Sequence, residues 1–434
     1  MIVIFLPLAV AMLYRNIKTM PQKDRLKVWL TVVVYLLAMV YYTDYINKQP
    51  TSFGFGIPQA DMLAHFRGAE ALSQGYTWAD LSSVASRFEE VGINTLGYFF
   101  YTTFLCLAVF IMPIFDVGTN VYLVYVFQII LSVDACVRFN RFYRRCIPDV
   151  KKNTAFYILV CCVPFVVQAC QLMRDIYYMW MIAILLEFVQ KHYLEKMTAP
   201  SEKNRLFREN KSRVLQTKVV YSSTLLFLMA MCFCLRFYSA ILFLPLVFYY
   251  SGKRQTGAII SLVVSVVLFA GIDIVNVVRE MLGVPWEITS PDMNESIQFF
   301  MFPNIVNQSK YLLNWYYYFG NTIDVSGCNV PGVYYAMSVW NIWSIPLAAI
   351  GLVTAFRKHK AETVMWTTIL LNIVMVYSIT YNAIDTRHKF FMVLSMCFLA
   401  LRGITWLKKK SKALYLAYNG LFVLVVVFIL LFSW

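Results

Sequence analysis

Two polar side chains stand four residues apart just beyond an apolar segment near the start of the chain. Asp61 and His65 lie in the stretch QADMLAHF. Residues with this spacing share a face of a helix, and a carboxylate beside an imidazole is a typical general base with the group that orients it. Helix capping also explains Asp61, because an aspartate at the N-cap stabilises a helix by about 1 kcal/mol. The spacing therefore predicts either a catalytic base, with His65 as its partner, or a helix cap.

Three further places put arginine at turns between apolar segments. Arg174 is followed by Asp175, Arg236 lies between two apolar runs, and Arg387 and His388 precede a late one. Each arginine alone fits a surface salt bridge or a side chain whose charged end reaches to the membrane edge. Together with a nearby carboxylate they favour an anionic ligand, because a guanidinium group binds phosphate oxygens through two parallel hydrogen bonds. We predict that these basic side chains bind the phosphate of a substrate.

The elements that carry these residues are long apolar runs. Of the 434 residues, 60% are hydrophobic and only 14% are charged. A lipid environment leaves exposed backbone groups without partners, and the runs lack the alternation of barrel strands, so we expect an all-α polytopic membrane protein. We therefore expect a single membrane domain, 1–434, with about 12–13 transmembrane helices. The expected spans are 1–14, 28–44, 95–114, 119–137, 154–171, 175–190, 219–236, 238–251, 257–277, 332–355, 362–381, 389–406 and 413–433.

The net charge of +15 does not indicate nucleic acid, because the basic residues are sorted into short links between apolar runs. Such sorting sets membrane orientation. It predicts that links 15–27, 138–153 and 190–218 face the cytoplasm, and that the longer loops 45–94 and 276–331, in which acidic residues outnumber basic ones, face outward.

The predicted spans and the predicted sidedness conflict at one point. Three apolar runs separate link 15–27 from link 138–153, whereas two links on the same side require an even number of crossings. Either 95–114 or 119–137 is re-entrant or incomplete, or link 138–153 is an exception to the positive-inside rule.

The two outer loops hold most of the polar content. The first contains turn residues and then a short helix expected from Asp61 to Ser73, with Asp61 as its N-cap and Gly75 as its terminator. The second is rich in aromatic residues, among them Trp315, which suit either a membrane-interface belt or stacking against sugar rings. The scattered cysteines and the four histidines show no metal-ligand spacing, so the sequence predicts no metal and no cofactor.

Several short motifs, in order, resemble the multispanning GT-C glycosyltransferases. They are the run from Asp61 to Gly75, NTLGY at 94–98, Arg144-Arg145 before a run with Pro164 and then Arg174-Asp175, Leu235-Arg236-Phe237-Tyr238, and Arg387-His388-Lys389-Phe390. The chain departs from the family in having no second acid beside Asp61 and no large soluble C-terminal domain. The same motifs resemble, nearly as well, the capsule and O-antigen repeat-unit polymerases.

Both resemblances imply a polyprenyl-phosphate- or pyrophosphate-linked saccharide as substrate, bound on the outer face of a membrane that we expect to be the bacterial inner membrane. In this reading Asp61 is the base, His65 orients it, Arg174, Arg236, Arg387 and His388 hold the donor phosphate, and Asp175, Tyr238 and Trp315 contact substrate. A lipid-linked saccharide flippase or transporter is the alternative from another class. Membrane lipid is an expected partner and nucleic acid is not.

Overall fold

The computed structural model is built from helices. It describes residues 2–18, 20–50, 52–57, 61–83, 93–111, 113–198, 211–270, 333–380 and 386–432. Apart from one isolated bridge between Gly54 and Ile57, every regular element in these ranges is helical. The elements are α1 (Ile2–Ile17), α2 (Gln22–Asn47), α3 (Asp61–Ser73), η1 (Trp78–Ser83), α4 (Ile93–Leu105), η3 (Cys106–Ile111), α5 (Val117–Cys146), α6 (Thr154–Val160), α7 (Val163–Ala169), α8 (Asp175–Thr198), α10 (Lys211–Leu235), α11 (Phe237–Tyr250), α12 (Arg254–Ala270), α16 (Val333–Lys358), α17 (Lys360–Thr380), α18 (Thr386–Lys410) and α19 (Lys412–Phe432).

The helical, apolar character expected from the sequence is confirmed. Among the described residues, four helices are long and apolar enough to cross a membrane: α2, α5, most of α16 and most of α18. Shorter apolar helices of 10–17 residues include α1, α11 and α12. The larger count of 12–13 crossings stays a prediction.

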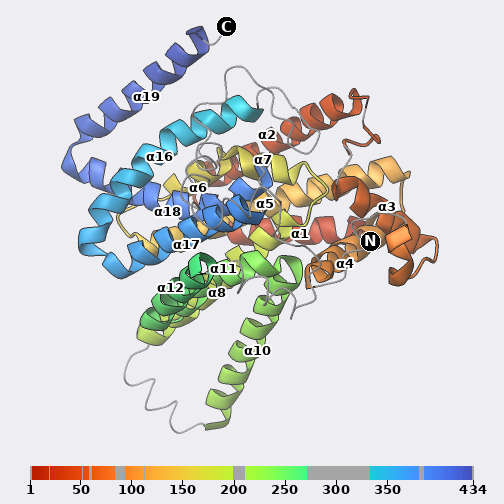
Figure 1. Ribbon diagram of the computed structural model, residues 1–434, viewed down its shortest axis with the longest axis horizontal. Coiled ribbons are helices and arrows are strands. Elements are labelled where there is room, and N and C mark those ends of the chain that lie inside the picture. Colours follow the sequence, from red (N-terminus) through yellow and green to blue (C-terminus); the bar gives the residue numbers. More distant parts are fainter. Residues whose placement is uncertain are drawn as a thin grey trace.

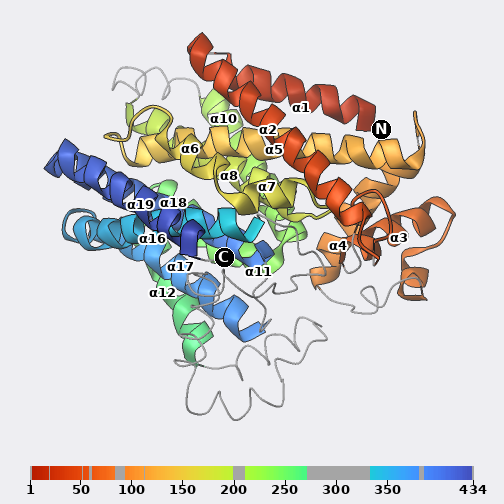
Figure 2. The ribbon, with the colours of Figure 1, turned by 90° about the horizontal axis from the view of Figure 1, so that it is seen from above.

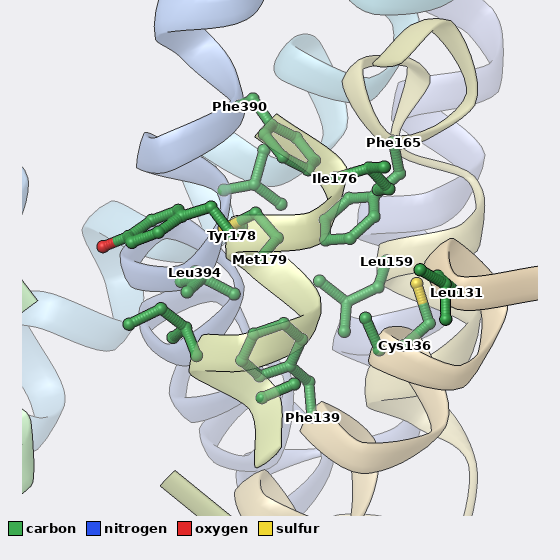
Figure 3. Close-up of a cluster of buried hydrophobic side chains, with 14 of the residues drawn as sticks. Leu131, Cys136, Phe139, Leu159, Phe165, Ile176, Tyr178, Met179, Phe390 and Leu394 are labelled. Carbon is green, nitrogen blue, oxygen red and sulfur yellow. The ribbon is translucent and has the colours of Figure 1, made fainter. Parts of the chain in front are cut away.

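The centre of the molecule is formed by α5 and α18. In each, 83% of the apolar window is buried, against 33% for α2, which places these two helices inside and α2 at the periphery. Figure 3 shows the packing where they meet α6, α7 and α8. The labelled side chains of that cluster are Leu131, Cys136, Phe139, Leu159, Phe165, Ile176, Tyr178, Met179, Phe390 and Leu394.

The predicted single span 154–171 is wrong. The structure has two seven-residue helices there, α6 and α7, separated at Cys161 and Cys162, and Cys162 is extended with φ −77° and ψ 110°. Pro164 lies in the first turn of α7, where its missing N–H costs nothing. In a continuous helix Pro164 would remove the backbone hydrogen bond to the carbonyl of Val160 and its ring would clash with that carbonyl, so α6 ends and a new helix starts.

Helices α1 and α5 run parallel. The rings of Phe5 and Phe127 pack at one end, with centroids 6.3 Å apart, and Asn16 Nδ2 donates to Asp134 Oδ1 at 2.6 Å towards the other. The basic residues that follow α1 and those that end α5 therefore lie at the same end of the bundle, which we call the basic end. The opposite end carries α3 and α4, which lie together at the right of Figures 1 and 2, and we call it the α3 end.

The segment 93–111 explains the conflict over crossings. Its early part packs on α3 through His65 and Tyr98, and its late part packs on α3 through Phe66 and Phe110, whose centroids are 5.4 Å apart. The next helix, α5, then starts at the same end, because Tyr125 Oη donates to the Phe55 carbonyl at 3.1 Å. Segment 93–111 thus begins and finishes at the α3 end. Among the described residues between the two basic links, α2 and α5 are the helices that run from one end of the bundle to the other.

Candidate functional site

A buried ion pair joins the start of α8 to the turn between α10 and α11. Asp175 opens α8 and is fully buried, and Arg236 Nη2 lies 2.6 Å from its Oδ1. The helix dipole at the start of α8 adds to the stabilisation of this carboxylate. Its second oxygen, Oδ2, is buried and has no hydrogen-bond partner among the described residues. The structure therefore brings together two of the residues that the sequence singled out, as partners of each other.

A second group is a cluster of stacked side chains. The ring of Tyr98 stacks on the imidazole of His65, with centroids 4.8 Å apart and planes at 24°, and the guanidinium of Arg174 also lies over the Tyr98 ring, with its Cζ 4.2 Å from the centroid. An arginine over an aromatic face is favoured electrostatically, more strongly when water is excluded. Both His65 and Arg174 are buried, at 1% and 5% exposure. Tyr98 thus links α3 to the turn before α8.

Gly97 makes the close approach of Arg174 possible. A Cβ at this position would overlap Arg174 Nη1 and lie 2.6 Å from the backbone carbonyl oxygen of Leu235. Any larger residue would push the arginine away or part α4 from the end of α10. From the sequence, Gly97 and Tyr98 stand out only in the motif NTLGY, which predicts no role for either side chain, although Tyr98, Tyr101 and Thr102 have the i, i+3, i+4 spacing of one helix face.

The two groups form one site at the α3 end. Arg174 and Asp175 are consecutive, and the guanidinium of Arg236 lies over the ring of Phe391, 5.8 Å from its centroid. Phe391 is one helical turn beyond Arg387 and His388 in α18. The first turn of α18 is therefore at the same end of the bundle as Arg236, although the side chains of Arg387 and His388 lie outside the described ones.

The side chain of His65 is buried against α4 and is not exposed on the surface of α3. Its Nδ1 is hydrogen-bonded to Thr102 Oγ1 at 3.0 Å, and its ring meets Tyr101 edge-on at 4.8 Å between centroids. Helix α3 itself runs from Asp61 to Ser73 and is followed by Gly75 at φ +93°, which confirms the predicted helix and its terminator. The sequence had placed Asp61 at the N-cap, but it is the first helical residue of α3, one position after the N-cap. The side chain of Asp61 is not among those described, so its pairing with His65 stays a prediction.

Two other predicted substrate contacts also stay predictions. Tyr238 is in the first turn of α11, beside Arg236, but its side chain is not described, and Trp315 lies outside the described residues altogether. Two unpredicted hydroxyls lie in the same region. Tyr101 Oη and Tyr177 Oη are buried without a hydrogen-bond partner among the described residues, and their rings are 5.4 Å apart. They are polar groups that a hydroxyl-rich ligand can satisfy.

A separate buried ion network lies towards the basic end. Asp134 accepts from Arg138 Nε at 2.7 Å and from Trp180 Nε1 at 2.8 Å, and Glu187 lies 3.0 Å from Arg138 and 2.8 Å from Arg141. These contacts tie α5 to α8. Arg138 and Arg141 belong to the predicted cytoplasmic link 138–153, but in the structure helix α5 continues through both residues.

The chemistry available at the α3 end is that of anion and polar-ligand binding. Among the described residues, no group of three or more His, Cys, Asp or Glu side chains is arranged to hold a metal ion. No protein-family model matches the chain, and no curated protein matches it.

Proposed function

We propose that the chain is an integral-membrane glycosyltransferase of the GT-C type, which takes a sugar from a polyprenyl-linked donor at the α3 end. The observation that carries the proposal is the meeting of Arg174 and Arg236, from two distant parts of the chain, at one buried site beside the helix that starts with Asp61. A lipid-anchored substrate reaches such a site from the bilayer edge, with its tail left in lipid.

The division of roles follows from the chemistry of the groups. Arg174 and Arg236, with Arg387 and His388 of α18, bind the donor phosphate, because charge-assisted hydrogen bonds to phosphate are short and strong. Asp61 removes the proton from the acceptor hydroxyl. His65 acts through Tyr98, which its ring supports, and so helps to hold Arg174 in place.

Two residues with the same chemistry allow a direct test of the base. Asp61 is the first residue of α3, and Asp116 is the N-cap of α5, where its carboxylate accepts from the Thr119 N–H at 2.8 Å. Asparagine caps a helix as well as aspartate does. We expect Asp61→Asn to lower sugar transfer by roughly 10²- to 10⁴-fold, the range for loss of a general base. Asp116→Asn should leave transfer near the wild-type rate.

The assay uses purified protein in vesicles with radiolabelled polyprenyl-phosphate and polyprenyl-pyrophosphate saccharides. Transfer of one sugar supports the proposal, and chain extension supports the repeat-unit polymerase instead. Movement of the lipid-linked saccharide across the vesicle membrane without transfer supports the flippase. Near-normal transfer by the Asp61 variant would reduce that residue to a helix cap.

The outward orientation of the site needs its own measurement. Gln74, just after α3, and Lys410, at the end of α18, are both exposed and lie at opposite ends of the bundle. A cysteine placed at 74 should react with a membrane-impermeant reagent added from outside, and one at 410 should not. Labelling at 410 alone would place the α3 end in the cytoplasm.

A further inference from the structure

A small cavity opens at the basic end, far from the site described above. It lies between the link that joins α5 to α6 and the last turns of α18, and its volume is about 180 Å³. From Phe391, beside Arg236, to Lys408, at the cavity, α18 rises roughly 25 Å at 1.5 Å per residue. The residues that line it are Asp149, Val150, Lys151, Thr154, Ile404, Thr405, Lys408 and Lys409.

The charges in this cavity do not cancel. Asp149, its one acidic lining residue, is paired with Lys409 at 2.5 Å. Neither Lys151 nor Lys408 has a carboxylate partner in the part of the chain that the structure describes. Lys408 Nζ lies over the ring of Tyr415, 4.3 Å from its centroid, which fixes its position without neutralising it. Two lysines without a carboxylate partner among the described residues therefore line the same small space.

The remaining lining suits an anion with several oxygen atoms. The side-chain hydroxyl of Thr154 can donate, whereas that of Thr405 already donates to the Leu401 carbonyl at 2.8 Å and can only accept. The volume is below the 300–1,000 Å³ typical of pockets for whole small-molecule ligands. It fits a phosphate group better than a nucleotide.

The surroundings identify the source of that phosphate. Trp406, next to the lining residues, is 39% exposed, and Leu416 of the following helix is 59% exposed. An exposed tryptophan and leucine beside a lysine cavity, where a long apolar helix ends, is the pattern of a membrane interface. Basic pockets at such interfaces bind anionic headgroups, and the apolar side chains can meet the acyl chains. We propose that this cavity binds the phosphate of an anionic membrane lipid through Lys151 and Lys408.

The test compares two double variants with the same loss of charge. Lys151→Gln/Lys408→Gln removes the charges of the two lysines that line the cavity and have no carboxylate partner among the described residues. Lys410→Gln/Lys412→Gln removes two exposed ammonium groups close to it that do not line it. The full-length protein in neutral detergent is titrated with dihexanoyl phosphatidylglycerol, with dihexanoyl phosphatidylcholine and with inorganic phosphate, and bound species are counted by native mass spectrometry.

We expect phosphatidylglycerol to bind the wild-type protein more tightly than phosphatidylcholine does. The cavity variant should bind it about 30-fold more weakly, from roughly fivefold for each of the two lysines. The control variant should change by less than about threefold. Equal losses in the two variants would show a diffuse surface charge effect and overturn the proposal. Inorganic phosphate that binds as tightly as the lipid would overturn the lipid as its source. If the double variant does not fold, the single variant of the exposed Lys151 carries the test.

Discussion

The ion pair between Asp175 and Arg236 gives the sharpest test of how this site is held. Asp175 is fully buried, and the side chain of Arg236 is 15% exposed. Removing one partner of such a pair leaves an uncompensated buried charge and costs about 3–5 kcal/mol. Because a folded protein is stable by only about 5–15 kcal/mol, Arg236→Met should visibly lower the thermal stability as well as donor use. A purely functional arginine would lower donor use alone.

The chain offers a matched control for this substitution. Lys48 and Asp44 lie at the same end of the bundle and are also 2.6 Å apart, but their side chains are 72% and 60% exposed. Exposed pairs contribute only about 0–1 kcal/mol, so Lys48→Met should shift the unfolding midpoint little. Unfolding is followed in neutral detergent by differential scanning fluorimetry.

The double variant Asp175→Leu/Arg236→Met separates the structural role from the functional one. Replacing a buried ion pair by apolar side chains of similar volume is often neutral or stabilising, so the double variant should regain most of the stability lost by Arg236→Met. Donor transfer should stay low, because the guanidinium that binds phosphate is still absent. A double variant as unstable as the single one would refute the coupling of the two residues. Wild-type donor affinity in the double variant would remove Arg236 from the phosphate site.

Three further predictions follow from close contacts and from one titrating group. Gly97→Ala should lower transfer by about 10²-fold, because the new Cβ would displace Arg174 by about 1 Å from the position in which it binds the donor phosphate. Unchanged kinetics would show that Gly97 does not hold the arginine in place. Gly403→Ala should destabilise the protein by about 1–3 kcal/mol, because its Cβ would overlap backbone of α16. Gly420→Ala, inside α19 and with open space around it, should be neutral or stabilise by up to about 1 kcal/mol, because alanine is the better helix former; equal midpoints for the two variants would contradict the helix crossing. A hydrogen bond from its lysine partner lowers the pKa of the Asp149 carboxyl below 3.8. The stability that this carboxylate gives is present at neutral pH and is lost as the pH falls through the lowered pKa. Because this pair, like Asp44 and Lys48, is more than half exposed, the midpoints of wild type and Asp149→Asn should differ only slightly at neutral pH, and the difference should disappear as the pH falls below 3.8; a difference that persists at acid pH would contradict this.

Local features of this fold were predictable from the sequence because their causes are local. Helix α3 was expected at 61–73 and occurs there, since an apolar face and a following glycine define it without help from the rest of the chain. The positions of the basic residues in links 15–27 and 138–153 likewise predicted that these residues lie at one end of the bundle. The break between α6 and α7 was missed although Pro164 marks it, because the apolar run is continuous across it.

The contacts that hold the site were not predictable, because they join residues far apart in the chain. The described hydrogen bond of His65 goes to Thr102, on another helix, and no rule of local spacing predicts such a contact. The same limit applies to α5. Its arginines Arg138 and Arg141 were read as a link, whereas Glu187 on α8 compensates their charge inside the bundle and lets the helix continue.

The way in which the two site arginines are held bears on how they act. Arg236 is fixed by Asp175, and Arg174 is fixed by the face of Tyr98 and by the space at Gly97. Charged donors that are already in place need no reorganisation when a ligand arrives, and this preorganisation is what makes electrostatic stabilisation effective.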